Sequence, residues 1–309
     1  MTGCLGIDTS NYTTSAAVYR EDGTGRNSSR LLDVEKGGVG LRQSDALFQH
    51  VKRLPERFSD LREAGFLTEI TAVGASTQPR AVEGSYMPCF LAGTSQGQVL
   101  AETLQVPFYG FSHQQGHIAA ACWSAGRLEL LDEPILAWHL SGGTTELLMV
   151  VPEKGNVRAA RIGGTTDLAA GQLIDRTGKL LQLDFPAGKA LDRLASQTEE
   201  KERFRVRLDG LNFSLSGVEN KAQKLVEKGK EPAAVARYVL LTIASLIRRA
   251  TDKAKLLYPG LPVLCSGGVA SNSILRSLLY DAVFAAPEFS TDNAMGIAIL
   301  ARRRLERGE

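Results

Sequence analysis

Two stretches of the chain repeat one design, and this repeat constrains the fold more than any other feature of the sequence. Residues 5–19 run from an apolar strand through a small hydroxylic turn and a Thr-Thr pair into a second apolar strand. Residues 135–151 follow the same order, with two glycines in the turn. The repeat distance is far longer than the roughly 20–50 residues of a solenoid unit, so it predicts a duplicated α/β lobe.

The segments around the two hairpins alternate between helical and strand patterns, as in α/β proteins. In the first lobe the patterns predict a flexible glycine loop at 37–40, helices at 44–58 and 92–104, and strands at 72–76 and 107–111. In the second lobe they predict a helix at 167–183 with Asp167 as its N-cap, strands at 211–216, 262–265 and 283–284, helices at 232–257 and 273–280, and a terminal helix from Ala294.

His113 and His117 are two of only four histidines in the chain, and they are four residues apart. On a helix this spacing puts both rings on one face, with Cβ atoms about 6 Å apart, so that two ring nitrogens can bind one metal ion. Ser112 is a good N-cap for such a helix, and Gly116 allows another segment to approach its backbone closely. The alternative is two partly exposed histidines on a surface helix.

The composition describes an ordinary globular protein. The net charge is +2, so no strongly basic field indicates a nucleic-acid partner. The four cysteines form no CxxC pair and favour buried thiols in a reducing compartment. There is no basic leader and no run of about 18 apolar residues, which predicts a cytoplasmic protein without a membrane partner.

Small polar residues follow several buried strands and are candidates for ligand binding. Asp8 ends the first strand, where it can position a cation or water, although an ordinary hairpin explains the same residues. Gly142 and Gly143 have no Cβ, so a phosphate can lie against their N–H groups, and residues 266–272 repeat this arrangement before a helix. Considered alone, Asp175 is typical of a solvated surface acid, and Asp292 of the N-cap of the terminal helix.

Taken together, these motifs resemble the threonylcarbamoyl transferase family that installs threonylcarbamoyladenosine in tRNA, once labelled O-sialoglycoprotein endopeptidase. The resemblance runs almost end to end, from Gly6-Ile7-Asp8-Thr9-Ser10 to Thr291-Asp292-Asn293, and includes the distance from Gly93 to His113. It implies an α/β fold of two ribonuclease-H-like lobes, as in the actin/Hsp70/sugar-kinase superfamily. We expect one lobe at 1–132, completed by the helix at 293–309, and the other at 133–292.

The resemblance also implies a site and a reaction. His113, His117 and Asp292 match the metal ligands of the family, and imidazole and carboxylate suit zinc and iron equally. We assign Asp8 and Asp175 as catalytic carboxylates. The residues expected to hold the adenylate are Leu140, Ser141, Gly142, Gly143, Thr144, Asp175, Gly188, Asp192 and Asn272. The family transfers threonylcarbamoyl from threonylcarbamoyl-adenylate to the N6 amine of an adenosine in tRNA and releases AMP. Implied partners are the adenylate (possibly ATP or AMP), tRNA, other proteins of the modification complex, and a second subunit in a homodimer or heterodimer.

Several positions depart from the family pattern. Asn11-Tyr12-Thr13 stands where the family carries acids, Gln115 replaces a glutamate, Thr144 replaces a histidine, Glu219 replaces a lysine, and residues 78–84 form a longer loop. These changes predict that transfer to tRNA is weaker than is usual in the family or needs partner subunits. The alternative is a divergent paralogue that binds metal and adenine nucleotide but has another acceptor or no catalytic activity.

Two other functions fit less well. In a metalloprotease with the H-E-x-x-H motif, the residue after the first histidine is the general base, but here it is Gln114, which cannot accept a proton. A small-molecule kinase of the same fold would give His113, His117 and Asp292 no evident role.

Overall fold

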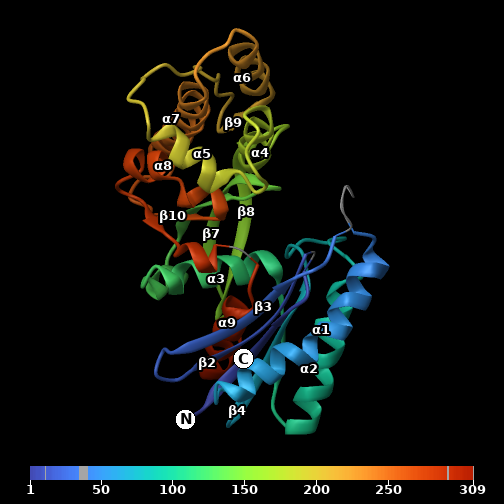
Figure 1. The fold of residues 1–309 in the computed structure, drawn as a ribbon. Coiled ribbons are helices and arrows are strands. Elements are labelled where there is room, and N and C mark those ends of the chain that lie inside the picture. The colour runs from blue at the N-terminus through green and yellow to red at the C-terminus, as the bar shows by residue number, and fades with distance from the viewer. Residues whose placement is uncertain (11, 35–40, 291, 309) are drawn as a thin grey trace. The chain divides into compact units, whose positions relative to one another are not determined.

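The computed structural model describes residues 1–10, 12–34, 41–290 and 292–308 (Figure 1). Asn11, the predicted loop at 37–40 and Thr291 lie outside these ranges. The chain divides into two compact units, and each is described by itself below. Unit 1 comprises residues 1–133, 151–159 and 292–309, and unit 2 comprises residues 134–150 and 160–291. Unit 1 therefore includes residues 151–159 and Asp292, which the sequence analysis placed in the second lobe.

Unit 1 contains a five-stranded sheet in the order β3-β2-β1-β4-β5. The strands are β1 (Gly3–Asp8), β2 (Thr13–Arg20), β3 (Gly25–Leu31), β4 (Ile70–Gln78) and β5 (Phe108–Ser112). The predicted hairpin at 5–19 is confirmed, because β1 and β2 are antiparallel with Leu5 opposite Val18. Strands β1, β4 and β5 are parallel. Their carboxyl ends therefore meet at one edge, which carries Asp8 and Ser112.

Helices cover both faces of this sheet, and the alternation of side chains along β1 shows which helix lies on which face. The helices are α1 (Gln43–Glu63), α2 (Phe90–Leu104), α3 (His113–Ser124) and α9 (Met295–Arg307). Figure 1 shows α1 and α2 together on one side. A Cβ on Gly93 of α2 would lie 3.1 Å from Ile7, whereas a Cβ on Gly6 would lie 2.5 Å from the backbone N of Ala298 in α9. Helix α9 therefore occupies the face opposite α2.

Helices α3 and α9 cross at two glycines. A Cβ on Gly296 would lie 1.8 Å from the carbonyl oxygen of Gly116, and a Cβ on Gly116 would lie 2.9 Å from the side chain of Ile297. This confirms the prediction that Gly116 admits a close backbone approach. The segment that approaches is the start of α9, directly after Asp292.

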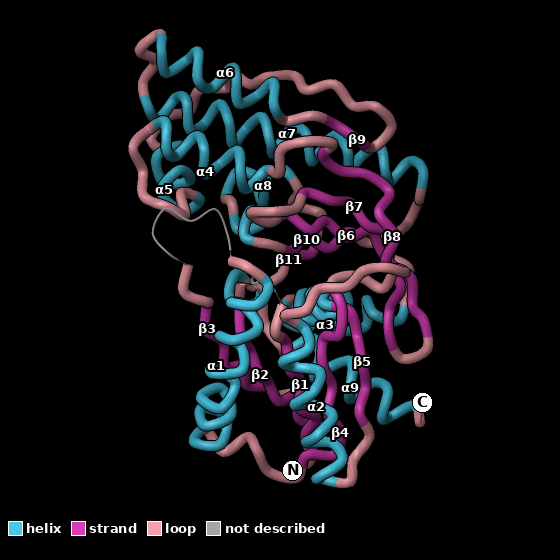
Figure 2. Tube along the Cα trace, turned by 90° about the vertical axis from the view of Figure 1, so that its right-hand side faces the viewer, coloured by secondary structure: helices cyan, strands magenta, loops and turns pink. Residues whose placement is uncertain are grey.

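Unit 2 is built on the second predicted hairpin, which is also confirmed. Its sheet has the order β11-β10-β6-β7-β8-β9 (Figure 2), of which the end of β7 and the start of β8 (residues 151–159) belong to unit 1. The strands are β6 (Ile135–Leu140), β7 (Thr145–Glu153), β8 (Asn156–Thr165), β9 (Asn212–Phe213), β10 (Val263–Ser266) and β11 (Val283–Phe284). Strands β6 and β7 are antiparallel, and β10 pairs with β6 in parallel. The Gly-Gly turns at 142–143 and 267–268 therefore follow neighbouring parallel strands.

Five α-helices pack in the described part of unit 2, and the longest has the predicted bounds. The helices are α4 (Ala170–Leu180), α5 (Gly188–Ala195), α6 (Ser216–Glu227), α7 (Pro232–Leu257) and α8 (Ser273–Leu278). Trp138 is fully buried, and its indole N–H donates to Thr251 of α7 over 2.9 Å. This bond ties the longest helix to the central strand. Across the residues that the structure describes, no helix is long and apolar enough to span a membrane.

Some predicted boundaries are wrong, and polar contacts explain the largest error. Asp167 is not the N-cap of α4, which begins at Ala170. Its carboxylate instead accepts bonds from the hydroxyls of Ser214 and Ser216 and from the backbone N of Leu215. The predicted strand at 211–216 shortens to β9, because those residues turn to reach Asp167. Strands β3 and β8 were missed, since their sequences mix charged and small residues without a clear apolar period.

His50 of α1 is a fully buried histidine outside the predicted site. Its Nδ1 lies 2.8 Å from the hydroxyl of Thr14 on β2. Burial disfavours the imidazolium, and nearby Arg53 adds to this effect, so that the pKa of His50 falls to about 4 despite the opposing charge of Asp8. His50 is therefore neutral in the folded protein at neutral pH.

We expect Gly296→Ala to destabilise the protein by about 1–3 kcal/mol, because the added methyl group overlaps the backbone of Gly116 and must push α3 and α9 apart. Gly217→Ala in α6 is the matched control, because its Cβ would meet only one atom, at 3.8 Å. Urea denaturation followed by circular dichroism measures both. Equal stability of the two variants would contradict the close helix crossing.

We expect the free energy of unfolding to fall as the pH drops from about 6.5 towards 4, partly because of His50. In that window the unfolded chain binds a proton at this histidine and the folded chain does not, so the slope from this group reaches at most about 1.4 kcal/mol per pH unit. His50→Gln removes the group, and urea denaturation at pH values from about 7.5 down to about 4.5 compares the two proteins. Parallel pH profiles would contradict the lowered pKa.

Candidate functional site

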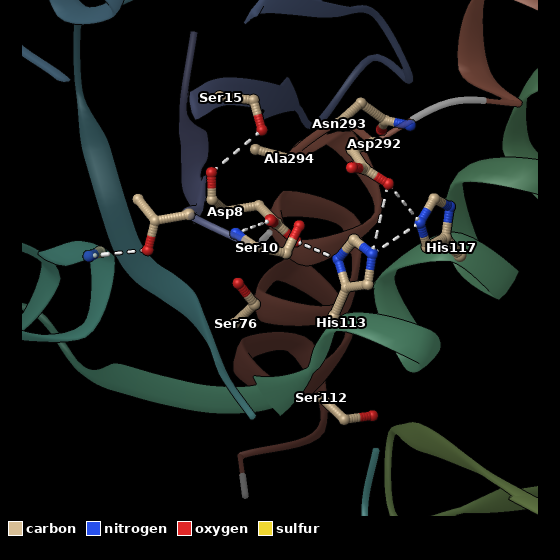
Figure 3. A network of polar contacts seen from close by, with 12 residues as sticks. Asp8, Ser10, Ser15, Ser76, Ser112, His113, His117, Asp292, Asn293 and Ala294 are labelled. Carbon is tan, nitrogen blue, oxygen red and sulfur yellow. Dashed lines mark hydrogen bonds and ion pairs between the residues drawn. The ribbon is translucent and has the colours of Figure 1, made fainter. Parts of the chain in front are cut away.

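His113, His117 and Asp292 converge on one point in unit 1 (Figure 3). The Nε2 atoms of the two histidines are 2.8 Å apart. One carboxylate oxygen of Asp292 lies 3.2 Å from Nε2 of His117 and 3.4 Å from Nε2 of His113. Each residue offers a ligand atom, and these atoms all lie within 4.8 Å of one another. Two imidazole nitrogens and one carboxylate oxygen form a donor set for a divalent ion such as zinc or iron.

The start of α3 fixes the first histidine, and the predicted N-cap at Ser112 is confirmed. The hydroxyl of Ser112 accepts a bond from the backbone N of Gln115, whose side-chain oxygen accepts one from the backbone N of Ser112 over 2.8 Å. This capping box makes His113 the first residue of the helix. His117 follows one turn later on the same face. It is buried, so the alternative of a surface histidine is wrong for this residue.

Asp292 is not the N-cap of α9, so the alternative considered for it is wrong. The N-cap position is Ala294, whose backbone N donates to Asn27 over 3.1 Å. Asn293 accepts a bond from the backbone N of Met295 over 3.1 Å. Asn27 and Asn293 therefore accept hydrogen bonds from the backbone N–H groups at the start of the helix. The carboxylate of Asp292 is directed at the histidines instead.

Asp8 is buried behind His113, and sequence reasoning did not find this pairing. One of its carboxylate oxygens lies 2.7 Å from Nδ1 of His113, and the other accepts a bond from the backbone N of Ser10 over 2.8 Å. A carboxylate at Nδ1 orients the ring and leaves Nε2 for a metal ion. The parallel strands β1 and β5 end at the same sheet edge, and this was the signal that could have revealed the pair.

The charges around the histidine pair favour a cation there. Burial disfavours a charged His113, but the carboxylates of Asp8 and Asp292 outweigh that effect and raise the pKa of His113 to about 10. Burial likewise opposes ionisation of Asp292, yet bonds to His113 and His117 hold the pKa of its carboxyl well below the usual range. Two ionised carboxylates thus flank the two rings, and this arrangement also suits a bound metal ion.

Two buried hydroxyls near Asp8 and His113 have no hydrogen-bond partner among the described residues. They belong to Ser10 and Ser76, which are 1% and 0% exposed. Figure 3 shows both side chains on the Asp8 side of the His113 ring. A buried polar group without a partner is costly, so these hydroxyls are candidates for contact with a ligand or with water.

In unit 2, the turn after β6 is tightly hydrogen-bonded but open at its glycines. The Ser141 hydroxyl lies 2.7 Å from that of Thr144 and accepts a bond from the backbone N of Thr144 over 3.0 Å. A Cβ on Gly142 or Gly143 would meet no other described atom within 4 Å. The side chain of Leu140 is fully buried, so only its backbone can contact a ligand. The turn leaves room for a group such as a phosphate.

Contacts link this turn to the other predicted adenylate residues. Gly171 at the start of α4 packs against the turn, because its Cβ would lie 2.6 Å from Gly142. Asp175 follows one turn later on α4 and accepts a bond from the backbone N of Ala187, which precedes Gly188. Asp192 follows Gly188 by one turn of α5, and its carboxylate accepts a bond from the Asn272 side chain over 2.7 Å. The structure thus brings the predicted residues of unit 2 into one connected group.

Comparison with known proteins identifies the family. The model of TsaD, tRNA N6-adenosine threonylcarbamoyltransferase, matches residues 35–299. A protein of that name from Thermus thermophilus is 35% identical over 317 residues, covering 98% of this chain and 93% of the relative. This chain belongs to the tRNA N6-adenosine threonylcarbamoyltransferase family. The family inferred from the sequence motifs is therefore confirmed.

Solved structures confirm the actin/Hsp70/sugar-kinase fold expected for this family. Full-length HypF in a phosphate- and nucleotide-bound form matches with a TM-score of 0.64 and 14% identity, over 98% of this chain and 47% of HypF. A ROK family glucokinase from Streptomyces griseus matches with a TM-score of 0.53 and 12% identity, over 97% of this chain and 99% of the kinase. At these identities the comparison supports the fold alone.

Two departures from the threonylcarbamoyltransferase pattern have structural partners. The side-chain amide of Gln115 caps α3 and donates to the carbonyl of Val157 over 2.7 Å, which a carboxylate cannot do. Gln115 therefore has a structural role in this chain, and the effect of losing a glutamate at this position on the acceptor chemistry stays a prediction. Glu219 pairs with Arg176 of α4, with both of its carboxylate oxygens 3.0 Å from one guanidinium nitrogen. Tyr12 is 37% exposed, and no contact of its side chain with the described residues explains its presence there.

We expect Asp8→Asn to weaken zinc or iron binding about 10–100-fold, because the neutral amide holds and polarises the His113 ring less well. Asp22→Asn removes an exposed carboxylate of the same unit and is the matched control. Competition with a chromophoric chelator measures the metal affinity of the parent and both variants. Equal affinities in all three would contradict the role of Asp8.

Proposed function

We propose that this chain transfers a threonylcarbamoyl group from threonylcarbamoyl-adenylate to the N6 amine of an adenosine in tRNA. One observation carries the proposal: the convergence of His113, His117 and Asp292, with Asp8 behind His113, in a member of a family named for this activity. Because the acceptor is tRNA, we place the activity in the cytoplasm.

His113, His117 and Asp292 would hold one divalent metal ion. Three protein ligands are typical of catalytic metal sites, where a further position stays open for substrate. When bound, the ion supplies positive charge that stabilises the negative charge on the departing phosphate. Asp8 keeps the ring of His113 in place and acts on the reaction only through that ring. We therefore propose that Asp8 acts as a positioning residue for His113.

The connected group in unit 2 would hold the adenylate. Gly142 and Gly143 leave space for the phosphate beside backbone N–H groups, which stabilise the charge that develops there. Asp175, Gly188, Asp192 and Asn272 would bind the nucleoside. Asp175 and Asp192 already accept bonds from Ala187 and Asn272, so we propose that they hold the shape of the pocket as well as contacting the ligand.

The reaction balances without a further reactant. The N6 amine attacks the carbamoyl carbon of the adenylate, and a new C–N bond forms. The bond from that carbon to the phosphate oxygen breaks, and AMP leaves with the electron pair. One proton of the amine is released. The chain would bind and orient the two substrates and stabilise the negative charge on the leaving phosphate.

The acceptor side is where this member is expected to differ. Tyr12 and Thr13 stand in place of acids that could orient or deprotonate the attacking amine. We propose that the transfer is slower than is usual in the family or requires partner proteins. A paralogue that binds metal and adenine nucleotide but has another acceptor is the alternative that the experiment must separate.

The experiment combines purified protein, zinc or iron, threonylcarbamoyl-adenylate and unmodified tRNA, with and without cell extract. Mass spectrometry of digested tRNA measures threonylcarbamoyladenosine. We expect His113→Ala/His117→Ala to lower the yield of threonylcarbamoyladenosine more than about 100-fold. Loss of a residue that only supports a metal ligand already lowers metal affinity or activity about 10–100-fold. His50→Gln removes a histidine of the same unit outside the site and should keep the parental yield near neutral pH.

Three results would overturn parts of the proposal. Undiminished transfer by the double histidine variant would exclude metal assistance at this site. No transfer with or without extract, while calorimetry shows adenylate binding, would establish the paralogue with another acceptor. Full-rate transfer by the protein alone would show that the replacement of acids at Tyr12 and Thr13 has no cost.

A further inference from the structure

A strongly basic groove lies in unit 2, on a segment that the proposed chemistry does not use. It has a volume of about 590 Å³. Its lining combines one irregular segment before β9 with two turns of α7, and consists of Lys201, Glu202, Arg203, Phe204, Arg205, Ser245, Leu246 and Arg249. Four of these eight side chains are cations and one is an acid.

Three acids of this region face two cations outside the groove. Glu199 pairs with Arg237 over 3.2 Å, and Glu200 and Glu202 face Lys230 at 2.9 and 3.9 Å. Among the residues that the structure describes, no carboxylate pairs with the remaining cations of the segment and groove. These are Lys201, Arg203, Arg205, Arg207 and Arg249. The region therefore carries a local positive charge that the net charge of +2 does not reveal.

The segment that carries the arginines is held against the core. Phe204, Val206 and Leu208 pack inward, and Arg203, Arg205 and Arg207 alternate with them and are exposed. The backbone N of Phe204 donates to Thr242 over 2.9 Å. Arg249 donates to the carbonyl of Val206 over 2.8 Å. The arginine side chains thus project from a fixed backbone, which lowers the entropy cost of ordering them on a ligand.

We propose that this groove binds the phosphate backbone of RNA, and that it is a contact site for the tRNA acceptor. The inference rests on the proposed function. Guanidinium groups bind phosphates through paired hydrogen bonds, and several unpaired cations on one surface are typical of nucleic-acid sites. Phe204 lines the groove while its ring packs against the core, so only the part that faces the groove can contact an unstacked base. Only Phe204 and Leu246 of the lining are apolar, so it suits a polyanion better than a peptide.

The experiment compares two double variants that lose the same charge. Arg203→Ala/Arg205→Ala alters the groove, whereas Arg26→Ala/Arg62→Ala removes two exposed arginines of unit 1. Fluorescence anisotropy measures the Kd of labelled, unmodified tRNA between about 50 and 200 mM salt. We expect the groove variant to bind about 10-fold more weakly. The slope of log Kd against log salt should fall by about 1.4–1.8, since each lost phosphate contact removes about 0.7–0.9. The control should stay close to the parent.

Other outcomes would overturn the inference. Equal losses in both double variants would mean that net charge alone drives binding. Unchanged tRNA binding, with lost binding of polyglutamate in the groove variant, would assign the groove to an acidic protein. The transfer assay separates this inference from the proposed function. An unchanged KM for tRNA in the groove variant would overturn the inference and leave the function intact. A parent that binds tRNA through the groove but transfers nothing would overturn the function alone.

Discussion

The close contact between α3 and α9 is the constraint on which the candidate metal site depends. Gly116 and Gly296 let the two helices approach until backbone meets backbone. This crossing brings Asp292, at the entry to α9, beside the histidine pair at the start of α3. Because the carboxylate and the second histidine are 175 residues apart in sequence, no local pattern could position them. A rigid crossing of two helices on one face of a sheet can hold such a geometry within the tolerance that metal binding requires.

A second constraint is the burial of charge behind this crossing. Asp8 is almost fully buried, and an isolated carboxylate at such a place would be strongly destabilising. His113 and the backbone N of Ser10 compensate for its burial. The same compensation orients the ring that we propose as a metal ligand. Stability and site geometry therefore depend on one contact, and this explains why an acid stands at the end of β1 rather than an apolar residue.

The sequence predicted the parts of this structure that depend on local pattern. The two hairpins, the bounds of α7 and the cap at Ser112 follow from periodicity and turn chemistry. Asp292 was assigned only through family resemblance, because at its position an N-cap is the simpler explanation. The Asp8–His113 pair, the use of Gln115 in capping and the turn of residues 214–216 towards Asp167 depend on tertiary contacts. Those contacts override local preference, and a single sequence does not contain a signal for most of them.

Gln115 and Arg203 show why composition and motif departures must be weighed in three dimensions. A glutamine in place of a family glutamate suggested a lost acid, yet its amide donates a bond to Val157 that an acid could not form. A net charge of +2 suggested weak affinity for RNA, yet the acids beside Arg203 are already paired with Arg237 and Lys230. Binding of a polyanion depends on the cations that remain unpaired on one surface, and not on the sum over the chain. Of the departures from the family pattern, the exposed Tyr12 is the one for which the described part of unit 1 shows no structural role, whereas Thr13 is buried in β2.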